Sequence, residues 1–178
     1  LFGCTVTKNH NESGNSIPDS WSMAVAHAPE ECVSVDGEYQ TFGVGKFKDG
    51  ETLTQARLDA VLGYAFPSEK IPEKVSFSLN RQNNSLNVQF GQPINRDILM
   101  SASCSDGRLK VEQTVTGQYL GDGTTLDYSI IKIELAKSID GDLILHVFSD
   151  IQSSSFLIQK SRDLGESWSR YEEIKSKK

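Results

Sequence analysis

The sequence lacks several features that would assign it to a common protein class. It has no apolar run near the roughly 18 residues that a membrane-spanning helix needs. It has no excess of basic residues, since 18 lysines and arginines stand against 24 acidic residues. The net charge of -6 argues against binding to nucleic acid, whose phosphates call for a basic surface. A hydrophobic fraction of 37% in 178 residues is typical of one water-soluble globular domain.

Histidine is also scarce, and the three that occur (His10, His27 and His146) have no metal-binding spacing such as HExxH. The sequence has no Gly-x-Ser-x-Gly motif, no Gly-rich phosphate loop and no EF-hand calcium loop. We therefore predict no catalytic residue, no cofactor and no metal. His146 interrupts the apolar run 143–148, and we interpret it either as a hydrogen-bonded core histidine or as a residue that lines a cavity.

Cysteine occurs at only three positions, Cys4, Cys32 and Cys104. The stretch Leu1-Phe2-Gly3-Cys4 resembles the lipobox of bacterial lipoproteins, in which a peptidase cuts before a cysteine that carries lipid. The resemblance implies that residues 1–3 are the remnant of a signal peptide and that Cys4 is lipidated. Because threonine rather than aspartate follows Cys4, it also implies anchoring at the periplasmic face of the outer membrane. The alternative is a buried apolar N-terminus that contains a cysteine.

Lipidation of Cys4 would leave Cys32 and Cys104 as an even pair, in a compartment that permits disulfides. A disulfide between them would close a long loop and, in the chain-entropy model, stabilise the fold by roughly 4 kcal/mol. The alternative is two buried free thiols.

Composition divides the chain into a tether, a domain and a tail. Residues 4–20 are polar and rich in Gly, Ser and Asn, which predicts a flexible tether because so little apolar surface could be buried. Residues 21–174 are expected to form a single β domain that begins with the apolar stretch at Trp21. Residues 175–178, with three lysines, are expected to be a solvated tail.

The domain is predicted to be mainly β. A short first strand is expected at 38–42, and alternating apolar residues predict four hairpins, at 74–79 with 86–90, 98–104 with 109–115, 128–135 with 143–148, and 156–159 with 168–171. The third hairpin is joined through Asp140-Gly141, a strong hairpin signal. Successive hairpins predict an antiparallel meander, either a small up-and-down barrel of the lipocalin kind or a strongly curled sheet.

One short α-helix is predicted near 52–62. Thr52 and Gln55 have capping-box spacing, and Leu58, Val61 and Leu62 fall on one helical face before Gly63. We expect the helix to plug one end of a barrel or to cover an open face of the sheet.

Ser161, Asp163, Gly165 and Trp168 match S/T-x-D-x-G-x-x-W, and this stretch resembles the Asp-box of sialidases and related β-propellers. The motif predicts a structural hairpin turn in which aspartate bonds backbone amides, glycine takes a positive φ and tryptophan packs beneath the loop. A propeller needs several blades of about 40 residues, for which the chain is too short. A glycan-acting enzyme or a carbohydrate-binding domain is therefore kept as the alternative function.

Short motifs across the chain resemble those of a group of uncharacterised bacterial lipoproteins. They are a cysteine before a Gly-x-Tyr strand, a Cys-x-Asp-Gly-x-Leu turn, an Asp-Gly-x-Leu hairpin and a Trp-x-Arg-Tyr ending (Cys32, Gly37 and Tyr39; Cys104, Asp106, Gly107 and Leu109; Asp140, Gly141 and Leu143; Trp168, Arg170 and Tyr171). The resemblance implies an address and a fold but no activity.

The sequence thus predicts a membrane-anchored envelope lipoprotein that acts as a binding or structural module. Its expected partners are the membrane, through lipid on Cys4, and a hydrophobic small ligand or an envelope protein, but not nucleic acid. Enzymatic activity stays open, with a binding role favoured. The binding role predicts a cavity or an exposed apolar patch on the domain.

Overall fold

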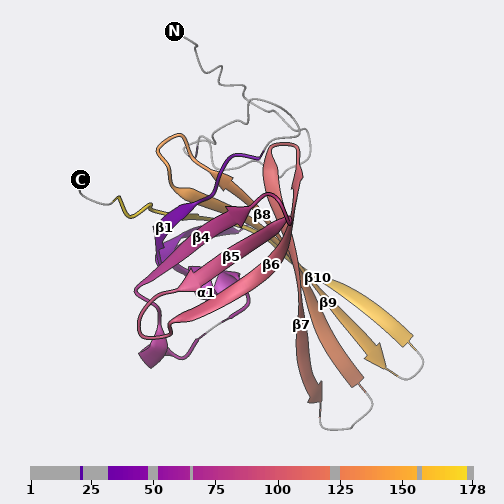
Figure 1. Ribbon diagram of the computed structural model, residues 1–178. Helices are drawn as coiled ribbons and strands as arrows, with labels where there is room; N and C mark the ends of the chain where they lie inside the picture. The colour runs from indigo at the N-terminus through magenta and orange to yellow at the C-terminus, as the bar shows by residue number, and fades with distance from the viewer. Residues whose placement is uncertain are drawn as a thin grey trace.

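Ten antiparallel strands form one curled sheet in the computed structural model, which describes residues 21, 32–47, 52–64, 66–120, 125–155 and 158–175 (Figure 1). The first five strands are β1 (Gly37–Gln40), β2 (Phe42–Phe47), β3 (Thr52–Arg57), β4 (Lys74–Asn80) and β5 (Ser85–Phe90). The other five are β6 (Arg96–Ser105), β7 (Arg108–Leu120), β8 (Thr125–Lys137), β9 (Leu143–Ser155) and β10 (Ile158–Tyr171). A four-residue helix, α1 (Leu58–Val61), and a single 3-10 turn, η1 (Ser68–Lys70), complete the described elements.

The strand order across the sheet is β1-β4-β5-β6-β7-β8-β9-β10-β2-β3. From β4 to β10 every strand pairs with the next one in the chain, as expected of a meander of hairpins. The sheet curls into a half-barrel (Figure 1). The predicted mainly β class and the curled antiparallel meander are therefore confirmed.

Three of the four predicted hairpins are confirmed by the register of their strands. β4 pairs with β5, β6 with β7, and β8 with β9. The turn after β6 has positive φ at both Asp106 (55°) and Gly107 (73°), the backbone that a tight two-residue hairpin requires. The fourth hairpin is wrong, because β10 runs unbroken from Ile158 to Tyr171 and pairs with β9 instead.

The hydrophobic core fills the inside of the curl. Alternation along each strand turns every second side chain inward, so Val75 and Phe77 of β4 pack with Val88 and Phe90 of β5. The long strands contribute Leu109, Leu135 and Leu145, which are directly paired across β7, β8 and β9. We call the opposite side of the sheet the outer face.

The predicted helix is shorter than expected. A helix does lie within 52–62, but it covers only Leu58–Val61, and Thr52–Arg57 is strand β3 paired with β2. The capping box at Thr52 is therefore wrong, since the helix begins after Arg57 and has no side-chain cap. Leu58 and Leu62 are buried in the core, which confirms the predicted apolar face.

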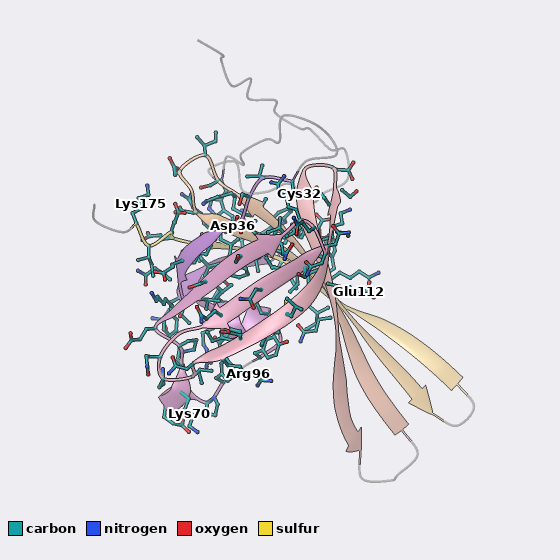
Figure 2. All side chains as sticks on the ribbon, in the orientation of Figure 1. Cys32, Asp36, Lys70, Arg96, Glu112 and Lys175 are labelled. Atoms are coloured by element: carbon teal, nitrogen blue, oxygen red, sulfur yellow. A yellow bond between two sulfur atoms is a disulfide. The ribbon has the colours of Figure 1, made fainter. Side chains whose placement is uncertain are left out.

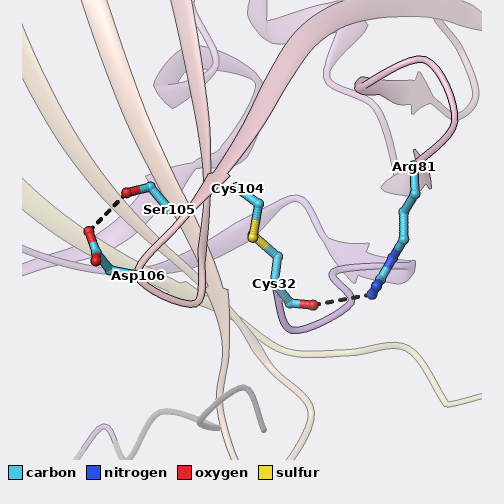
Figure 3. Close-up of a disulfide and its surroundings, with 5 residues drawn as sticks. All are labelled: Cys32, Arg81, Cys104, Ser105 and Asp106. Atoms are coloured by element: carbon cyan, nitrogen blue, oxygen red, sulfur yellow. Dashed lines mark hydrogen bonds between the residues drawn. A yellow bond between two sulfur atoms is a disulfide. The ribbon is translucent and has the colours of Figure 1, made fainter. Parts of the chain in front are cut away.

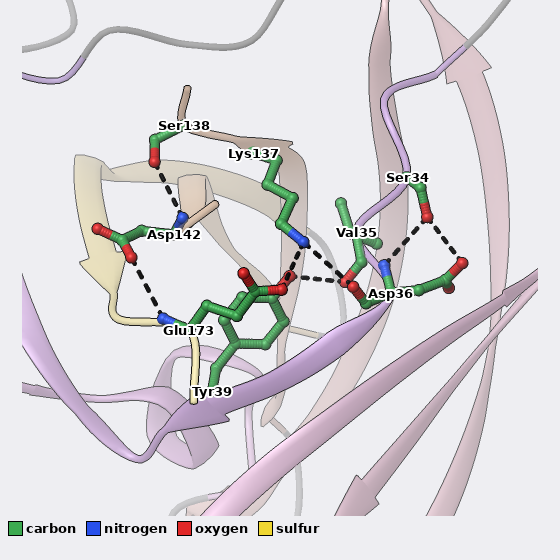
Figure 4. Close-up of polar contacts among 8 residues, drawn as sticks. All are labelled: Ser34, Val35, Asp36, Tyr39, Lys137, Ser138, Asp142 and Glu173. Carbon is green, nitrogen blue, oxygen red and sulfur yellow. Dashed lines mark hydrogen bonds and ion pairs between the residues drawn. The ribbon is translucent and has the colours of Figure 1, made fainter. Parts of the chain in front are cut away.

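The end of the chain closes against β1 (Figure 4). Beyond β10, the amide of Gln40 donates to the carbonyl of Glu172 (3.0 Å), and the amide of Ile174 donates to the carbonyl of Glu38 (2.7 Å). The Lys137 ammonium lies 2.7 Å from a Glu173 carboxylate oxygen beside the buried Tyr39 ring. These contacts connect β1 with the end of β8 and with the segment after β10. Since β1 is an edge strand of the sheet, they close the curled sheet at that edge.

Burial of Tyr39, together with the nearby carboxylates of Glu173, Asp36 and Asp142, raises the pKa of its hydroxyl well above the ordinary value. The hydroxyl donates to the carbonyl of Val35 at 2.9 Å. Tyr39 therefore stays a neutral phenol, and its hydroxyl holds the segment before β1 through Val35.

The far halves of β7 to β10 extend beyond the rest of the sheet (Figure 1). β6 pairs with β7 only as far as Val111, and β2 pairs with β10 only from Ser167 onward. Among the described residues, the next cross-strand row therefore spans only β7 to β10, without a partner on β6 or β2. It consists of Glu112, Lys132, Phe148 and Glu166. Acidic, basic and aromatic side chains thus adjoin on the outer face where the long strands leave the rest of the sheet.

Candidate functional site

A single cross-strand row of side chains runs over the outer face of six strands. Each member is directly paired with the next, in the order Ser103, Lys110, Glu134, His146, Trp168 and Lys46. Because their strand neighbours Leu109, Leu135 and Leu145 point into the core, these residues share the opposite face. Antiparallel pairing therefore brings together residues from β6, β7, β8, β9, β10 and β2.

His146 is buried at the centre of this row, with 4% of its surface exposed. Its ring lies parallel to the indole of Trp168, with centroids 3.6 Å apart, and 4.0 Å from the ring of Phe148. Nε2 is hydrogen-bonded to a carboxylate oxygen of Glu166, and Nδ1 lies 3.6 Å from Glu134 Oε2. His146 thus contacts two aromatic rings and has a carboxylate near each nitrogen.

Glu134 is held as a carboxylate by its neighbours. His146 is the largest influence that lowers its pKa, followed by Arg108, whose Nη1 donates at 2.7 Å, and by the charge of Lys110 at 3.5 Å. Burial acts in the opposite direction, and the net result is a pKa of about 2. At 3.6 Å the contact between His146 Nδ1 and Glu134 Oε2 is longer than a hydrogen bond.

Beside this cluster the outer face is hollowed into an open groove of about 460 Å³ over β6, β7, β8 and β9. Its outward-facing lining consists of Ser101, Ser103, Lys110, Glu112, Lys132, Glu134 and Phe148. The groove arises next to β6 because Ser101 and Ser103 are short, whereas the neighbouring β7 residues are long. Glu112 points away from the body at the base of the extended strands (Figure 2). A wall of long polar side chains therefore borders a floor of small ones.

The charges along the groove alternate in both directions. Lys110 is paired across the strands with Glu134, and Glu112 with Lys132. The Lys132–Glu112 pair is loose, at 3.9 Å, with 59% and 62% of the two side chains exposed. Exposed pairs of this kind contribute little to stability, so a ligand could open this one at small cost. The Glu134 side of the groove is fixed, and the Glu112 side is open to rearrangement.

A small apolar cluster covers the other flank of the His146 row. Ala136, Ile144 and Trp168 are buried there, and Trp21 packs against them from the segment before β1. Ile144 faces this cluster while Leu143 and Leu145 face the core, so β9 is covered on both sides as its apolar run predicted. Trp21 therefore touches the outer face close to the candidate site.

The predicted cysteine pair forms a disulfide (Figure 3). The sulfur atoms of Cys32 and Cys104 are 2.07 Å apart, and their Cα atoms are 5.6 Å apart. Arg81 donates to the carbonyl of Cys32 at 3.2 Å, which adds the β4–β5 turn to this junction. The disulfide ties the segment before β1 to the end of β6. Cys4 lies outside the described residues.

The predicted Asp-box turn is wrong as a description of the backbone. Ser161, Asp163, Gly165 and Trp168 all lie within β10, which pairs with β9 on both sides of a register shift between Asp163 and Gly165. The glycine coincides with an irregularity in the strand rather than with a hairpin turn. Continuous pairing with a 13-residue neighbour overrides the local turn preference. Trp168 is buried as expected, but against His146.

The groove itself was not predicted. Its sequence signal is the i, i+2 repetition of Ser101 with Ser103, Lys110 with Glu112, and Lys132 with Glu134. Such polar repeats mark one face of each strand, but they do not show that the three faces adjoin. His146, which was read as either a core or a cavity residue, is buried and touches two residues of the groove wall, Glu134 and Phe148.

No family model matches this sequence, and neither a curated protein nor a solved structure matches it significantly. Within the described ranges, no three His, Cys, Asp or Glu side chains are placed to hold a metal ion. None of the helices in the described part of the chain has the length and apolar character to cross a membrane.

Proposed function

We propose that the protein is a non-enzymatic binding module of the bacterial cell envelope whose ligand or partner lies in the groove over β6 to β9. The groove carries this proposal, because it combines a volume of about 460 Å³ with a wall held in place by the His146 cluster. Volumes of this size are typical of ligand sites with a few placed polar groups. The four charged side chains in its otherwise largely apolar lining favour a ligand that carries polar groups over the purely hydrophobic one that the sequence suggested.

The electrostatics of Glu134 favour binding over catalysis. A glycan-cleaving enzyme needs a carboxylic acid that keeps its proton near neutral pH, which requires a raised pKa. The pKa of Glu134 is held down at about 2 by His146, Arg108 and Lys110. This carboxylate is therefore suited to accept hydrogen bonds from a ligand, not to protonate a leaving group.

The envelope address rests on a separate argument. A disulfide between Cys32 and Cys104 supports an oxidising compartment, since such bonds are rare where thiols are kept reduced. Lipid on Cys4 would hold the domain at the periplasmic face of the outer membrane through the tether 4–20. Mass spectrometry of the membrane-extracted protein tests this: a first residue of acylated Cys4 supports the anchor, whereas unmodified Cys4 contradicts it.

A glycan-acting enzyme is the second candidate. Glu112 and Glu134 are diagonal neighbours on β7 and β8, because Lys110 is opposite Glu134 and Glu112 is opposite Lys132. Diagonal backbone positions lie about 7 to 8 Å apart, so the two carboxyl groups can reach the separation of paired catalytic carboxylates, about 5 to 10 Å. Hydrolysis of oligosaccharides that is lost in Glu112→Gln would support the enzyme and contradict the binding module.

Co-sedimentation with isolated bacterial envelopes tests the binding role. Ser103→Trp fills the groove from an exposed position, and Ser78→Trp makes the same change at an exposed position on β4. We expect the wild type and Ser78→Trp to sediment with the envelopes and Ser103→Trp to remain in solution. Equal sedimentation of all three proteins would contradict a role for the groove.

A further inference from the structure

We propose that the groove binds a neutral, polyhydroxylated chain, that is, a segment of glycan. This inference rests on the proposed binding function and names the ligand class of the same groove. It follows from the charge pattern, the hydrogen-bonding groups, the partly exposed aromatic ring and the open shape of the groove.

The charge balance of the groove disfavours ligands with net charge. Its four charged groups are two ammoniums and two carboxylates, arranged so that each faces a neighbour of opposite sign (Lys110, Lys132, Glu112 and Glu134). An anion near either lysine meets a carboxylate on the next strand, and a cation near either glutamate meets an ammonium. Attraction and repulsion therefore oppose each other for any ion, whereas a neutral ligand experiences neither.

The hydrogen-bonding groups of the groove suit hydroxyls. The lysines only donate and the ionised Glu134 only accepts, so a complementary ligand must offer both acceptors and donors at short intervals. A hydroxyl group does both, and it can also bond with the hydroxyls of Ser101 and Ser103. An apolar ligand would strip water from these charged groups without replacing its hydrogen bonds, which is costly.

Phe148 is the aromatic member of an apolar part of the lining that also includes Ala102, Val111 and Ile133. Its ring is partly exposed in the groove, and it contacts the tilted ring of His146, with centroids 4.0 Å apart. The face of an aromatic ring carries partial negative charge, which attracts the polarised C–H groups of a sugar ring. Trp168 stacks on His146, so the aromatic contacts continue across β9 and β10.

The groove is open to solvent rather than enclosed, so a chain could continue past it. The loose Lys132–Glu112 pair lies on its exposed side, where both side chains are free to turn toward sugar hydroxyls. The Glu134 side does not need to move, because Arg108 and His146 hold it. One fixed wall and one adjustable wall would accept an internal stretch of a repeating chain.

Titration of the full chain with soluble oligosaccharides tests this inference. The probes are tetrasaccharides of glucose and of N-acetylglucosamine, a sulfated heparin tetrasaccharide as the anion, spermine as the cation, and an uncharged Gly-Ser peptide. We expect a neutral tetrasaccharide to bind with an affinity that changes less than about twofold between about 50 and about 500 mM sodium chloride. Ser103→Trp should weaken this binding about tenfold or more, and Ser78→Trp should not.

A charge-neutral double variant sharpens the test. Lys132→Gln with Glu112→Gln keeps the net charge and removes two charge-assisted hydrogen bonds, so we expect binding to weaken about tenfold. Binding of the sulfated probe, spermine or the peptide in place of the neutral sugars would overturn the glycan inference. So would a neutral sugar that binds equally well to Ser103→Trp.

Failure of this inference is separable from failure of the proposed function. If sedimentation with envelopes is lost in Ser103→Trp but unaffected by excess neutral oligosaccharide, the groove binds something other than glycan and only the ligand class is wrong. If sedimentation does not depend on Ser103, the proposed function itself is wrong.

Discussion

The imidazole of His146 lies flat against the indole of Trp168, with their planes inclined by only 7°. The two residues are direct partners across β9 and β10, so the contact is set by sheet register. This stacking holds the His146 ring with Glu134 near Nδ1 and Glu166 near Nε2. It thereby helps to fix the Glu134 wall of the groove. Removal of the indole should therefore affect both stability and the site.

Trp168→Ala is expected to lower the free energy of unfolding by about 3 to 5 kcal/mol, because a buried aromatic ring and its stacking contact with His146 are lost. Urea unfolding followed by circular dichroism measures this. Trp21→Ala is the comparison, because Trp21 packs on the same cluster but is only partly buried, and its loss should be smaller. Equal losses in the two variants would contradict the central place given to Trp168.

Acid should destabilise the protein through Glu134. The folded-state pKa of this carboxyl is lowered from 4.5 to about 2, so its contribution is present above pH 4.5 and is lost as pH falls toward 2. After discounting for solvent screening, we expect a loss of about 2 kcal/mol across this window. Stability measured against pH in Glu134→Gln should lack this component, whereas the exposed Glu112→Gln should retain it. Identical acid profiles for wild type and Glu134→Gln would refute the assignment.

Loss of the disulfide should be costly. Cys32 and Cys104 are separated by 72 residues, and opening a loop of that length lowers stability by roughly 4 kcal/mol in the chain-entropy model. We expect Cys32→Ser with Cys104→Ser to melt at a markedly lower temperature than the oxidised protein and close to the reduced wild type. A double variant as stable as the oxidised protein would show that the bond adds nothing to folding.

Local patterns predicted the hairpins because each one depends on a few neighbouring residues. Val75, Phe77, Leu86 and Val88 alternate within short strands, and all four are buried in the core. The positive φ at Gly107 likewise follows from the local Asp106-Gly107 turn sequence. Where strand and turn are both encoded locally, the sequence was sufficient to place them.

Elements that depend on distant partners were missed. Thr52–Arg57 has helical spacing, but pairing with β2 makes it a strand. The Asp-box lies in a strand because β9 pairs along the whole length of β10. The His146 row needs the register of five successive strand pairs, which no single strand specifies. The candidate site could therefore not be assembled from sequence.

Close approach of β2 to β10 should make Gly43 hard to replace. A Cβ atom at Gly43 would lie 2.2 Å from the carbonyl oxygen of Arg170, which is part of a paired strand and cannot move aside. We expect Gly43→Ala to lose about 1 to 3 kcal/mol of stability. Gly91→Ala is the milder comparison, since its Cβ would lie 3.1 Å from Lys74 Cγ and 3.2 Å from the Lys74 carbonyl oxygen, against 2.2 Å at Gly43. Thermal melting compares the two, and a smaller loss for Gly43→Ala would count against the observed β2–β10 packing.

The central claim is that the groove over β6 to β9 is where this protein binds. Amide chemical-shift mapping tests it most directly, with the isotope-labelled full chain titrated with a soluble glycan-rich extract of bacterial envelopes. We expect the shifted amides to cluster at Ser101, Ser103, Lys110 and Lys132, and we expect Ser103→Trp to abolish the shifts and Ser78→Trp to leave them intact. Shifts confined to β1, β4 and β5, with the groove amides unchanged, would contradict it.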